Sequence, residues 1–410
     1  MELFIFKNIY KREILESVTK AFAKKDFYVD AISNLVNFAM ENGYKNNIWY
    51  AYLAHVLAYN ENPFSIACEN NGKVFGSTSI IMHDIEVFMD LFTLDIKKIS
   101  MGYENELTDF QMEREGFINY DIHAVNIIST LADDLSKCKI PAQFYNTLIS
   151  FYQKYGVGDY GFSKAFRLTD DKKIVPIKDV LNISFDDLVG YDWQKKRLRE
   201  NTLAFVSGKK ANNVLLYGDS GTGKSSSIKA VLNEFAPYGL RMIEVYKHQL
   251  SDVIDLIAAL KNRHYYFVIY MDDLSFEEEE ASYKYLKSII EGGLEATPSN
   301  VLIYATSNRR HLVKETFKDN GEIGDDLHRN ETKAEKLSLA ARFGLSILYM
   351  SPNSFEYKQI VKKLAMKYNI EISEDELLSK ATQWELKYGS LSGRTATQFI
   401  NYIASNNDNI

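Results

Sequence analysis

Residues 212–232 read NNVLLYGDSGTGKSSSIKAVL, and this stretch decides which fold we expect for the chain. The apolar run VLLY is typical of a buried strand, and the segment SSSIKAVLNEF after the loop is typical of a helix. Between them, GDSGTGKS fits the phosphate-binding loop pattern, with Gly218, Gly223, Lys224 and Ser225 at its defining positions. A strand, a glycine-rich loop and a helix in this order predict a nucleotide site.

The chemistry of the loop explains this prediction. Glycines allow the backbone to turn its N–H groups around a phosphate without a Cβ in the way. We expect Lys224 to reach the β- and γ-phosphates of ATP, and the Ser225 hydroxyl to ligate Mg²⁺. The positive end of the following helix favours the same anion. The expected binding residues are Gly218, Asp219, Ser220, Gly221, Thr222, Gly223, Lys224, Ser225 and Ser226.

Polar side chains follow two other apolar runs. YYFVIYMDDLSF ends in Asp272 and Asp273, where strands of a parallel sheet present ligands. We expect Asp272 to hold the magnesium through water and Asp273 to orient the attacking water. The alternative is an ordinary acidic turn. VLIYATSNRRHL ends near Asn308, whose amide either bonds the γ-phosphate or the water, or caps the strand.

Two arginines are further candidates. Arg342, in KLSLAARFGLSILYM, lies between a predicted helix and a predicted buried strand, where arginine is seldom found without a partner. Either it pairs with an acidic neighbour in its own chain, or it completes the site of an adjacent subunit. Arg394, in LSGRTATQF, begins the last predicted helix. It either folds back onto the phosphates or is exposed at the helix end.

The order of apolar runs predicts an α/β fold. The runs VLLY, RMIEVY, YYFVIYM, VLIYATS and LSILYM are separated by helical segments, a pattern typical of a parallel sheet covered on both faces. From residue 351 onward three helices are expected and no strand. We therefore predict a nucleotide-binding domain over residues 179–350 and a small helical lid over residues 351–410.

Residues 1–178 are predicted to form an all-helical domain, with a role that the residues do not indicate. In NNIWYAYLAHVLAYN, apolar side chains from Trp49 to Leu57 recur on one helical face. The many Tyr and Phe residues of this region either pack in its core or form a surface for bases or peptides. Residues 156–183 contain glycines, DDKK and Pro176, and we interpret them as a linker.

Composition excludes several classes of protein. No apolar run approaches the roughly 20 residues that a membrane helix needs. The basic residues near the N-terminus follow the apolar patch, which is the wrong order for a secretory signal. We expect a cytoplasmic protein with no membrane partner.

A net charge of −7 argues against a sequence-independent grip on nucleic acid. The basic stretches QKKRLRE and SGKKANN are either local contacts or solvated surface.

Together these motifs resemble those of an AAA+ ATPase, and more narrowly the family named domain of unknown function 815. The resemblance covers residues 183–403 and rests on FDDLVGYDWQ, GDSGTGKS, MDDLSFE, ATSNRRHL, SLAARFGL and LSGRTATQF. It implies a five-stranded parallel sheet of order 5-1-4-3-2. It also implies that Val189 and Gly190 help to enclose the adenine. The remaining implied roles are magnesium and water-activating carboxylates for Asp272 and Asp273, sensor 1 for Asn308, arginine finger for Arg342 and sensor 2 for Arg394.

One residue departs from the pattern of the superfamily, because most relatives have Glu where this chain has Asp273. A shorter carboxylate must sit closer to the water, so we expect slow hydrolysis, with Glu277 as a substitute base. The leading hypothesis is a homo-oligomeric ATPase that hydrolyses ATP to remodel or load a macromolecular partner, protein or nucleic acid. The alternatives are a nucleotide-gated switch or scaffold with little hydrolysis, and a DNA-associated loader-like ATPase.

Overall fold

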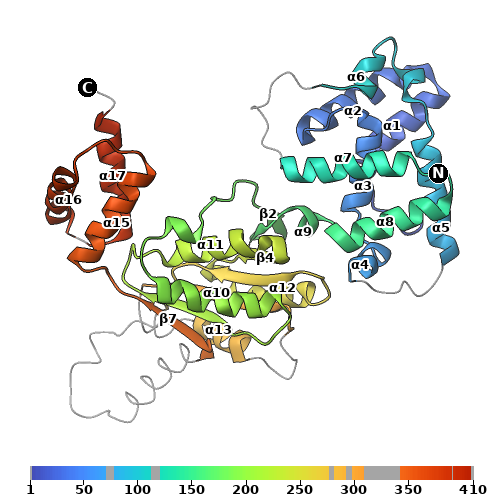
Figure 1. Cartoon of the computed structure of the whole chain (residues 1–410). Coiled ribbons are helices and arrows are strands. Elements are labelled where there is room, and N and C mark those ends of the chain that lie inside the picture. The colour runs from blue at the N-terminus through green and yellow to red at the C-terminus, as the bar shows by residue number, and fades with distance from the viewer. Residues whose placement is uncertain are drawn as a thin grey trace. The chain divides into compact units, whose positions relative to one another are not determined.

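A computed structural model describes residues 2–70, 78–111, 121–276, 281–291, 298–308, 342–389 and 391–407. The chain forms two compact units, which are described separately (Figure 1). The first unit comprises Met1–Ser163, with Pro176–Lys178 and Asn262–His264. The second unit comprises Lys164–Val175, Asp179–Lys261 and Tyr265–Ile410.

Helices build the first unit. Its α-helices are α1 (Arg12–Ala23), α2 (Tyr28–Asn42), α3 (Ile48–Tyr59), α4 (Pro63–Glu69), α5 (Thr78–Phe92), α6 (Glu104–Thr108), α7 (Ile122–Ser136), α8 (Pro141–Tyr155) and α9 (Asp159–Phe162). The helix predicted around Trp49 is confirmed as α3, but its buried residues surround the helix instead of forming one face. The helix predicted to begin at Pro141 and to stop at Gly156 is confirmed as α8, with Gly156 as its C-cap.

Aromatic side chains fill the core of this unit. Trp49 is fully buried, its ring stacks on Tyr52 with centroids 5.7 Å apart, and its indole N–H donates to the Leu91 carbonyl over 2.9 Å. Phe38 meets the edge of Tyr52 at 5.3 Å. Edge-on and offset contacts of this kind stabilise a core beyond simple area burial. For these aromatic residues the core interpretation is confirmed.

A seven-stranded, mostly parallel sheet forms the centre of the second unit. Its strands are β1 (Ala165–Leu168), β2 (Ile174–Pro176), β3 (Val214–Gly218), β4 (Leu240–Glu244), β5 (Tyr266–Met271), β6 (Val301–Ser307) and β7 (Leu345–Tyr349). They lie in the order β2-β1-β4-β5-β6-β3-β7. Every pair from β1 to β7 in this order is parallel.

The sheet corrects the sequence prediction in two respects. Seven strands stand where five in the order 5-1-4-3-2 were expected, although the five expected strands do lie side by side as β7-β3-β6-β5-β4. The additional β1 and β2 come from the stretch that we interpreted as a linker, and the sheet begins at Ala165, before the domain boundary predicted at residue 178. Strand β1 has four residues, and its backbone groups pair with β4, far along the chain. Local sequence carries little signal for such a strand.

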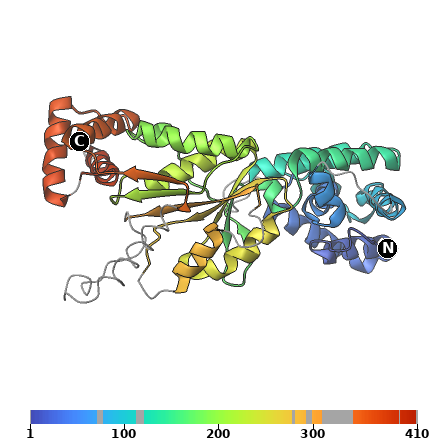
Figure 2. The ribbon, with the colours of Figure 1, turned by 90° about the horizontal axis from the view of Figure 1, so that it is seen from below.

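Helices cover both faces of the sheet, as its continuous apolar strands require. Figure 2 shows α10 (Asp192–Val206) and α11 (Lys224–Phe235) on one face. The other face carries α12 (Val253–Leu260) and α13 (Ala281–Glu291). Because β3, β5 and β6 are parallel neighbours, their carboxyl ends meet at one edge, where the loop after β3 and the polar residues after β5 and β6 converge.

Three helices complete the second unit and are seen in red in Figure 1. They are α15 (Ser354–Lys367), α16 (Glu374–Tyr388) and α17 (Gly393–Asn407), and they share a small apolar core. Asn353 opens α15 with a capping box that includes Glu356. We call this group the lid. Within the described ranges, no helix combines the length and apolar character needed to cross a bilayer.

Candidate functional site

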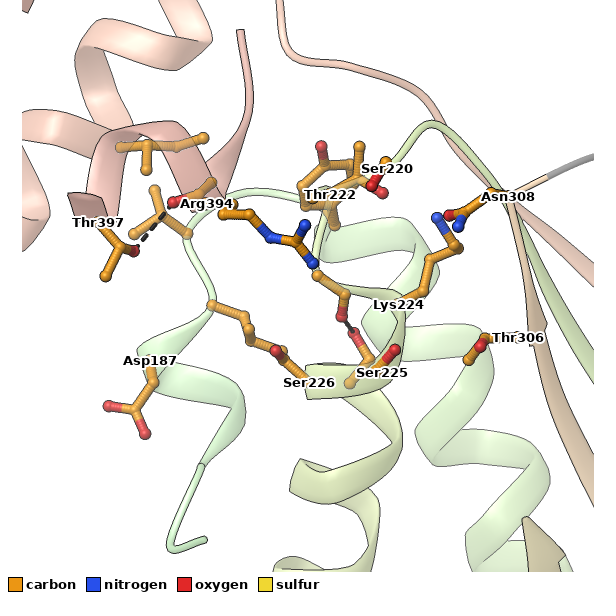
Figure 3. A pocket seen from close by; sticks show the side chains of 18 of the residues that line it. Asp187, Ser220, Thr222, Lys224, Ser225, Ser226, Thr306, Asn308, Arg394 and Thr397 are labelled. Atoms are coloured by element: carbon orange, nitrogen blue, oxygen red, sulfur yellow. Dashed lines mark hydrogen bonds between the residues drawn. The ribbon is translucent and has the colours of Figure 1, made fainter. Parts of the chain in front are cut away.

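A cavity of about 510 Å³ lies at the carboxyl edge of the sheet, within the size range of ligand sites. Its walls come from the loop after β3, the ends of β5 and β6, the segment before α10, and the lid helices α15 and α17. In Figure 3, Lys224, Thr306 and Asn308 lie on one side of the cavity, and Asp187 and Thr397 lie on the other. Segments far apart in the sequence therefore contribute to one site.

The loop after β3 has a backbone that glycine makes possible. Gly218 has a φ of 131°, and a Cβ placed on it would lie 2.0 Å from the Tyr349 carbonyl oxygen of the neighbouring strand. Gly223 has a φ of 93° and immediately precedes α11, which begins at Lys224. The first N–H groups of α11 therefore lie at the cavity, where the positive end of a helix favours an anion.

Lys224 carries a positive charge into this loop. Its side chain is buried and its ammonium donates to the backbone carbonyls of Gly218 (3.0 Å) and Asp219 (2.6 Å). Burial lowers the pKa of Lys224, and the nearby carboxylates of Asp219, Asp273 and Asp272 oppose that effect. Carbonyl groups stabilise an ammonium without cancelling its charge, so an anionic ligand fits this position.

Two hydroxyl groups converge on Asp272. Ser225 Oγ donates to Asp272 Oδ1 over 2.8 Å, and Thr306 Oγ1 donates to the same oxygen over 2.5 Å. Desolvation opposes ionisation of Asp272, but hydrogen bonds from Thr306 and Ser225 outweigh it and lower the pKa of the carboxyl group. A carboxylate beside a serine hydroxyl is a donor set that Mg²⁺ accepts. No group of three or more His, Cys, Asp or Glu in the described ranges could hold a metal by itself. In proteins Mg²⁺ is commonly held by one or two carboxylates together with waters and the phosphate oxygens of a substrate.

Asp273 and Asn308 form the second polar pair. Asn308 Nδ2 donates to Asp273 Oδ1 over 2.7 Å, and the Asp273 backbone N–H donates to Thr306 Oγ1 over 2.9 Å. Asp273 has a φ of 49°, a left-handed conformation that Asp tolerates better than most residues. The turn after β5 is thus held against the end of β6, with the Asp273 side chain at the cavity.

The lid contributes one face of α17. Arg394, Thr397 and Gln398 lie at helical spacing and all line the cavity. Figure 3 shows the Arg394 side chain reaching from α17 toward the middle of the cavity. The Arg394 backbone N–H donates to the Gly221 carbonyl over 3.2 Å, so α17 begins directly on the loop after β3.

Apolar side chains line a further part of the cavity. Leu188 and Val189 come from the segment before α10, and Ile360 and Leu364 come from α15. Val189 also packs against the apolar core of the lid. A charged end and an apolar part in one cavity suit a ligand that combines an anion with a flat ring.

Most of the predicted residues meet in this cavity. Among those that line it are Val189, Ser220, Gly221, Thr222, Gly223, Lys224, Ser225, Ser226, Asp272, Asp273, Asn308 and Arg394. Gly190, Gly218 and Asp219 adjoin the lining residues without belonging to them. Arg342 lies half-buried just before β7 and is not a lining residue, so its role as an arginine finger for a neighbour stays a prediction. Glu277 lies outside the described residues.

Sequence reasoning missed several lining residues. Ile360 and Leu364 look like core positions of a lid helix, and Asp187 and Tyr191 like ordinary loop and cap residues. The spacing of Thr397 and Gln398 after Arg394 was a usable signal, because residues three and four apart share a helix face. No comparable signal marks the others, because they reach the cavity through tertiary packing.

Comparison with known proteins identifies the family of the chain. The family model described as "Protein of unknown function (DUF815)" matches residues 162–407, which is more than half of the chain. The chain belongs to the DUF815 family. This confirms the narrower resemblance drawn from the motifs, and the DUF815 match contains the cavity and the lid. No curated protein sequence matches the chain.

Among solved structures, two variants of RuvB from Thermotoga maritima are similar to the chain. They are 16% and 15% identical to it, with TM-scores of 0.34 and 0.32. Each alignment covers 53% of this chain and 71% of the RuvB chain. Likeness at this level carries no residue role over to the DUF815 chain.

Proposed function

We propose that the chain binds ATP with Mg²⁺ in this cavity and hydrolyses it to ADP and phosphate. The proposal rests on one observation, which is that three groups of side chains meet in the same cavity. These are the buried ammonium of Lys224, the Ser225–Asp272 pair and the Asp273–Asn308 pair. Phosphoryl transfer depends mostly on positioning and on charge stabilisation, and this set supplies both.

Each residue has a distinct role in the proposal. Lys224 would exchange its two carbonyl acceptors for oxygens of the β- and γ-phosphates. Ser225 and Asp272 would hold Mg²⁺, which supplies charge neutralisation on the phosphate oxygens. Asp273 would orient the attacking water, and Asn308, which bonds Asp273, would keep its carboxylate at the correct angle.

We further propose that ATP is hydrolysed between subunits of a homo-oligomer that remodels or loads a macromolecular partner. The support is the pair of arginines: Arg394 reaches the cavity of its own chain, whereas Arg342 does not line it. Loss of the γ-phosphate would remove the anion that both guanidinium groups contact, and lid and neighbour would then move.

Complementation tests this arrangement. Lys224→Ala and Arg342→Ala are prepared separately, and phosphate release is measured for each alone and for a mixture. Each variant alone is expected to be inactive, and the mixture is expected to recover part of the wild-type rate, because some sites combine an intact Lys224 with an intact Arg342. Full activity of Arg342→Ala alone would contradict a finger role. A wild type without phosphate release would contradict the ATPase.

A second function is favoured by the geometry of Asp273. Its carboxylate is one methylene shorter than Glu, and one of its oxygens already accepts from Asn308. A chain of this kind would bind Mg-ATP, hydrolyse it very slowly and act as a nucleotide-gated switch or scaffold. Asp273→Glu distinguishes the two functions. A switch should gain turnover from the longer carboxylate, whereas an ATPase already matched to Asp273 should lose turnover.

A further inference from the structure

The segment that joins the sheet to the lid is held at its first peptide unit. Strand β7 ends at Tyr349 and α15 begins at Ser354. The carbonyl of Met350 accepts from the Tyr191 hydroxyl over 2.9 Å. The N–H of Ser351, which belongs to the same peptide unit, donates to Asp219 Oδ2 over 2.7 Å. Both polar groups of one peptide are therefore fixed by side chains next to the cavity.

Asp219 connects this peptide to Lys224. Its backbone N–H donates to the Tyr349 carbonyl over 2.9 Å, and its own carbonyl accepts from the Lys224 ammonium over 2.6 Å. Hydrogen bonds from Ser351 lower the pKa of the Asp219 carboxyl group. The carboxylate is thus ionised at neutral pH and forms the stronger, charge-assisted kind of hydrogen bond. One residue of the loop contacts both the ammonium and the entrance to the lid.

The phosphate-loop pattern does not require this acid. Residues 219–222 occupy the variable positions of the pattern, between the glycine at Gly218 and the glycine at Gly223. Asp219 is exposed and lies outside the residues that line the cavity. Its carboxylate faces the joining segment, so a direct contact with the ligand does not explain it.

We propose that Asp219 is a positioning residue that couples phosphate binding in the loop to the position of the lid. The inference rests on the proposed function. When a phosphate takes the ammonium of Lys224, the Asp219 carbonyl loses a partner, while its N–H and carboxylate stay bonded to Tyr349 and Ser351. The hydrogen bonds of Asp219, the residue that holds the Met350–Ser351 peptide, then differ between the two ligand states, and coupling requires such a difference.

The test compares the full-length wild type with Asp219→Ala, Asp219→Asn and Tyr191→Phe. Glu371→Ala, which removes an exposed carboxylate of the lid, is the matched control. For each chain, calorimetry measures Mg-ATP affinity, phosphate release gives turnover, and amide hydrogen exchange is followed in residues 350–360 with and without Mg-ATP. Hydrogen exchange is the decisive readout, because a residue that only supports the loop would not uncouple the lid from the ligand.

In the wild type, Mg-ATP is expected to change exchange in residues 350–360. In Asp219→Ala this change should disappear and turnover should fall about tenfold, the size of one hydrogen bond to a charged group, while affinity changes less than about threefold. Asp219→Asn keeps an oxygen acceptor and should recover part of the change. Tyr191→Phe should reduce the change in exchange that Mg-ATP causes, and Glu371→Ala should show the same change as the wild type.

The outcomes separate this inference from the proposed function. A wild type that binds no Mg-ATP overturns the proposed function and the coupling with it. A wild type that binds Mg-ATP, together with an Asp219→Ala chain that keeps the ligand-dependent change in exchange, overturns the coupling alone. An Asp219→Ala chain that loses Mg-ATP affinity and turnover by the same factor also overturns the coupling alone. Should Asp219→Ala fail to fold, Asp219→Asn and Tyr191→Phe decide in the same way.

Discussion

The two units of the chain bury charge differently. In the helical unit, Glu69 is fully buried, and its carboxylate accepts from Arg263 Nε and Nη2, each over 2.9 Å, and from the Val157 N–H over 3.0 Å. In the second unit, the buried Lys224 ammonium donates to two backbone carbonyls. The first charge is paired directly with a charge of opposite sign. The second donates its hydrogen bonds to neutral carbonyls beside a cavity, with the carboxylates of Asp219, Asp272 and Asp273 nearby.

We propose that this difference separates a charge that only stabilises the fold from a charge that can bind a ligand. A buried ion pair with its hydrogen bonds satisfied gains little from a further ligand, whereas an ammonium held by carbonyls can exchange them for an anion. Asp84 also serves the fold, although its partners are neutral, because its fully buried carboxylate accepts from the N–H groups of Phe4, Ile5 and Phe6. The helical unit thus uses its buried charges to fix its own backbone.

The largest expected effect concerns the structural pair. Arg263→Met should destabilise the helical unit by about 3–5 kcal/mol, because it leaves the Glu69 carboxylate buried without its partner. Amide hydrogen exchange of α4 measures the loss. Lys20→Ala, which removes an exposed pair with Glu16, is the control and should cost less than about 1 kcal/mol. If Arg263→Met and Lys20→Ala lowered the free energy of unfolding by the same amount, the buried pair would not be structural.

The next effect concerns the ammonium of Lys224 at the cavity. Lys224→Ala should weaken Mg-ATP binding by about a hundredfold or more, the size of two charge-assisted hydrogen bonds, and should leave the melting temperature of the second unit unchanged or higher. Calorimetry and thermal unfolding test both parts. Lys210→Ala, at an exposed lysine outside the cavity, is the control. A clear drop in melting temperature for Lys224→Ala would make Lys224 a structural residue like Glu69.

A third prediction uses pH to sharpen the comparison. Burial, and to a smaller degree the charge of Lys11, lowers the pKa of His55 from 6.5 to about 3. Below pH 6.5 His55 binds a proton in the unfolded chain but not in the folded unit. The free energy of unfolding therefore decreases as pH falls. The loss is at most about 1.4 kcal/mol per pH unit for this group. Exchange of α3 amides from pH 6.5 to 5 measures the slope, and His55→Gln should flatten it. An unchanged slope in His55→Gln would contradict this account.

The smallest effect concerns Gly190, and Gly218 serves as the comparison. Gly190→Ala should cost about 1–2 kcal/mol of stability, because its φ of 80° is strained for alanine although nothing lies within 4 Å of the new Cβ. Gly218→Ala should cost more, because its Cβ would meet the Tyr349 carbonyl. Thermal unfolding ranks the two variants. A strong loss of Mg-ATP affinity in Gly190→Ala, without loss of stability, would instead support its predicted place at the adenine.

Local sequence was sufficient for the phosphate loop. The glycines, Lys224 and Ser225 lie within eight consecutive positions, so their spacing alone predicts how backbone N–H groups, ammonium and hydroxyl meet. The meeting of Asp272, Asp273 and Asn308 followed from a slightly longer argument, because carboxyl ends of neighbouring parallel strands share one edge. Regular helices were predictable for the same reason, since their apolar period is local.

Contacts between distant segments required the tertiary structure. Strand β1 pairs with β4, although its four residues resemble a linker, and the apolar part of the cavity combines Val189 with Ile360 of the lid. Asp219 meets Ser351 across 132 positions of sequence. Sequence alone thus determined the chemistry that a short run of residues carries. Packing decided which side chains complete the cavity and which peptide the Asp219 carboxylate holds, because such contacts form only when the sheet and the lid bring remote segments together.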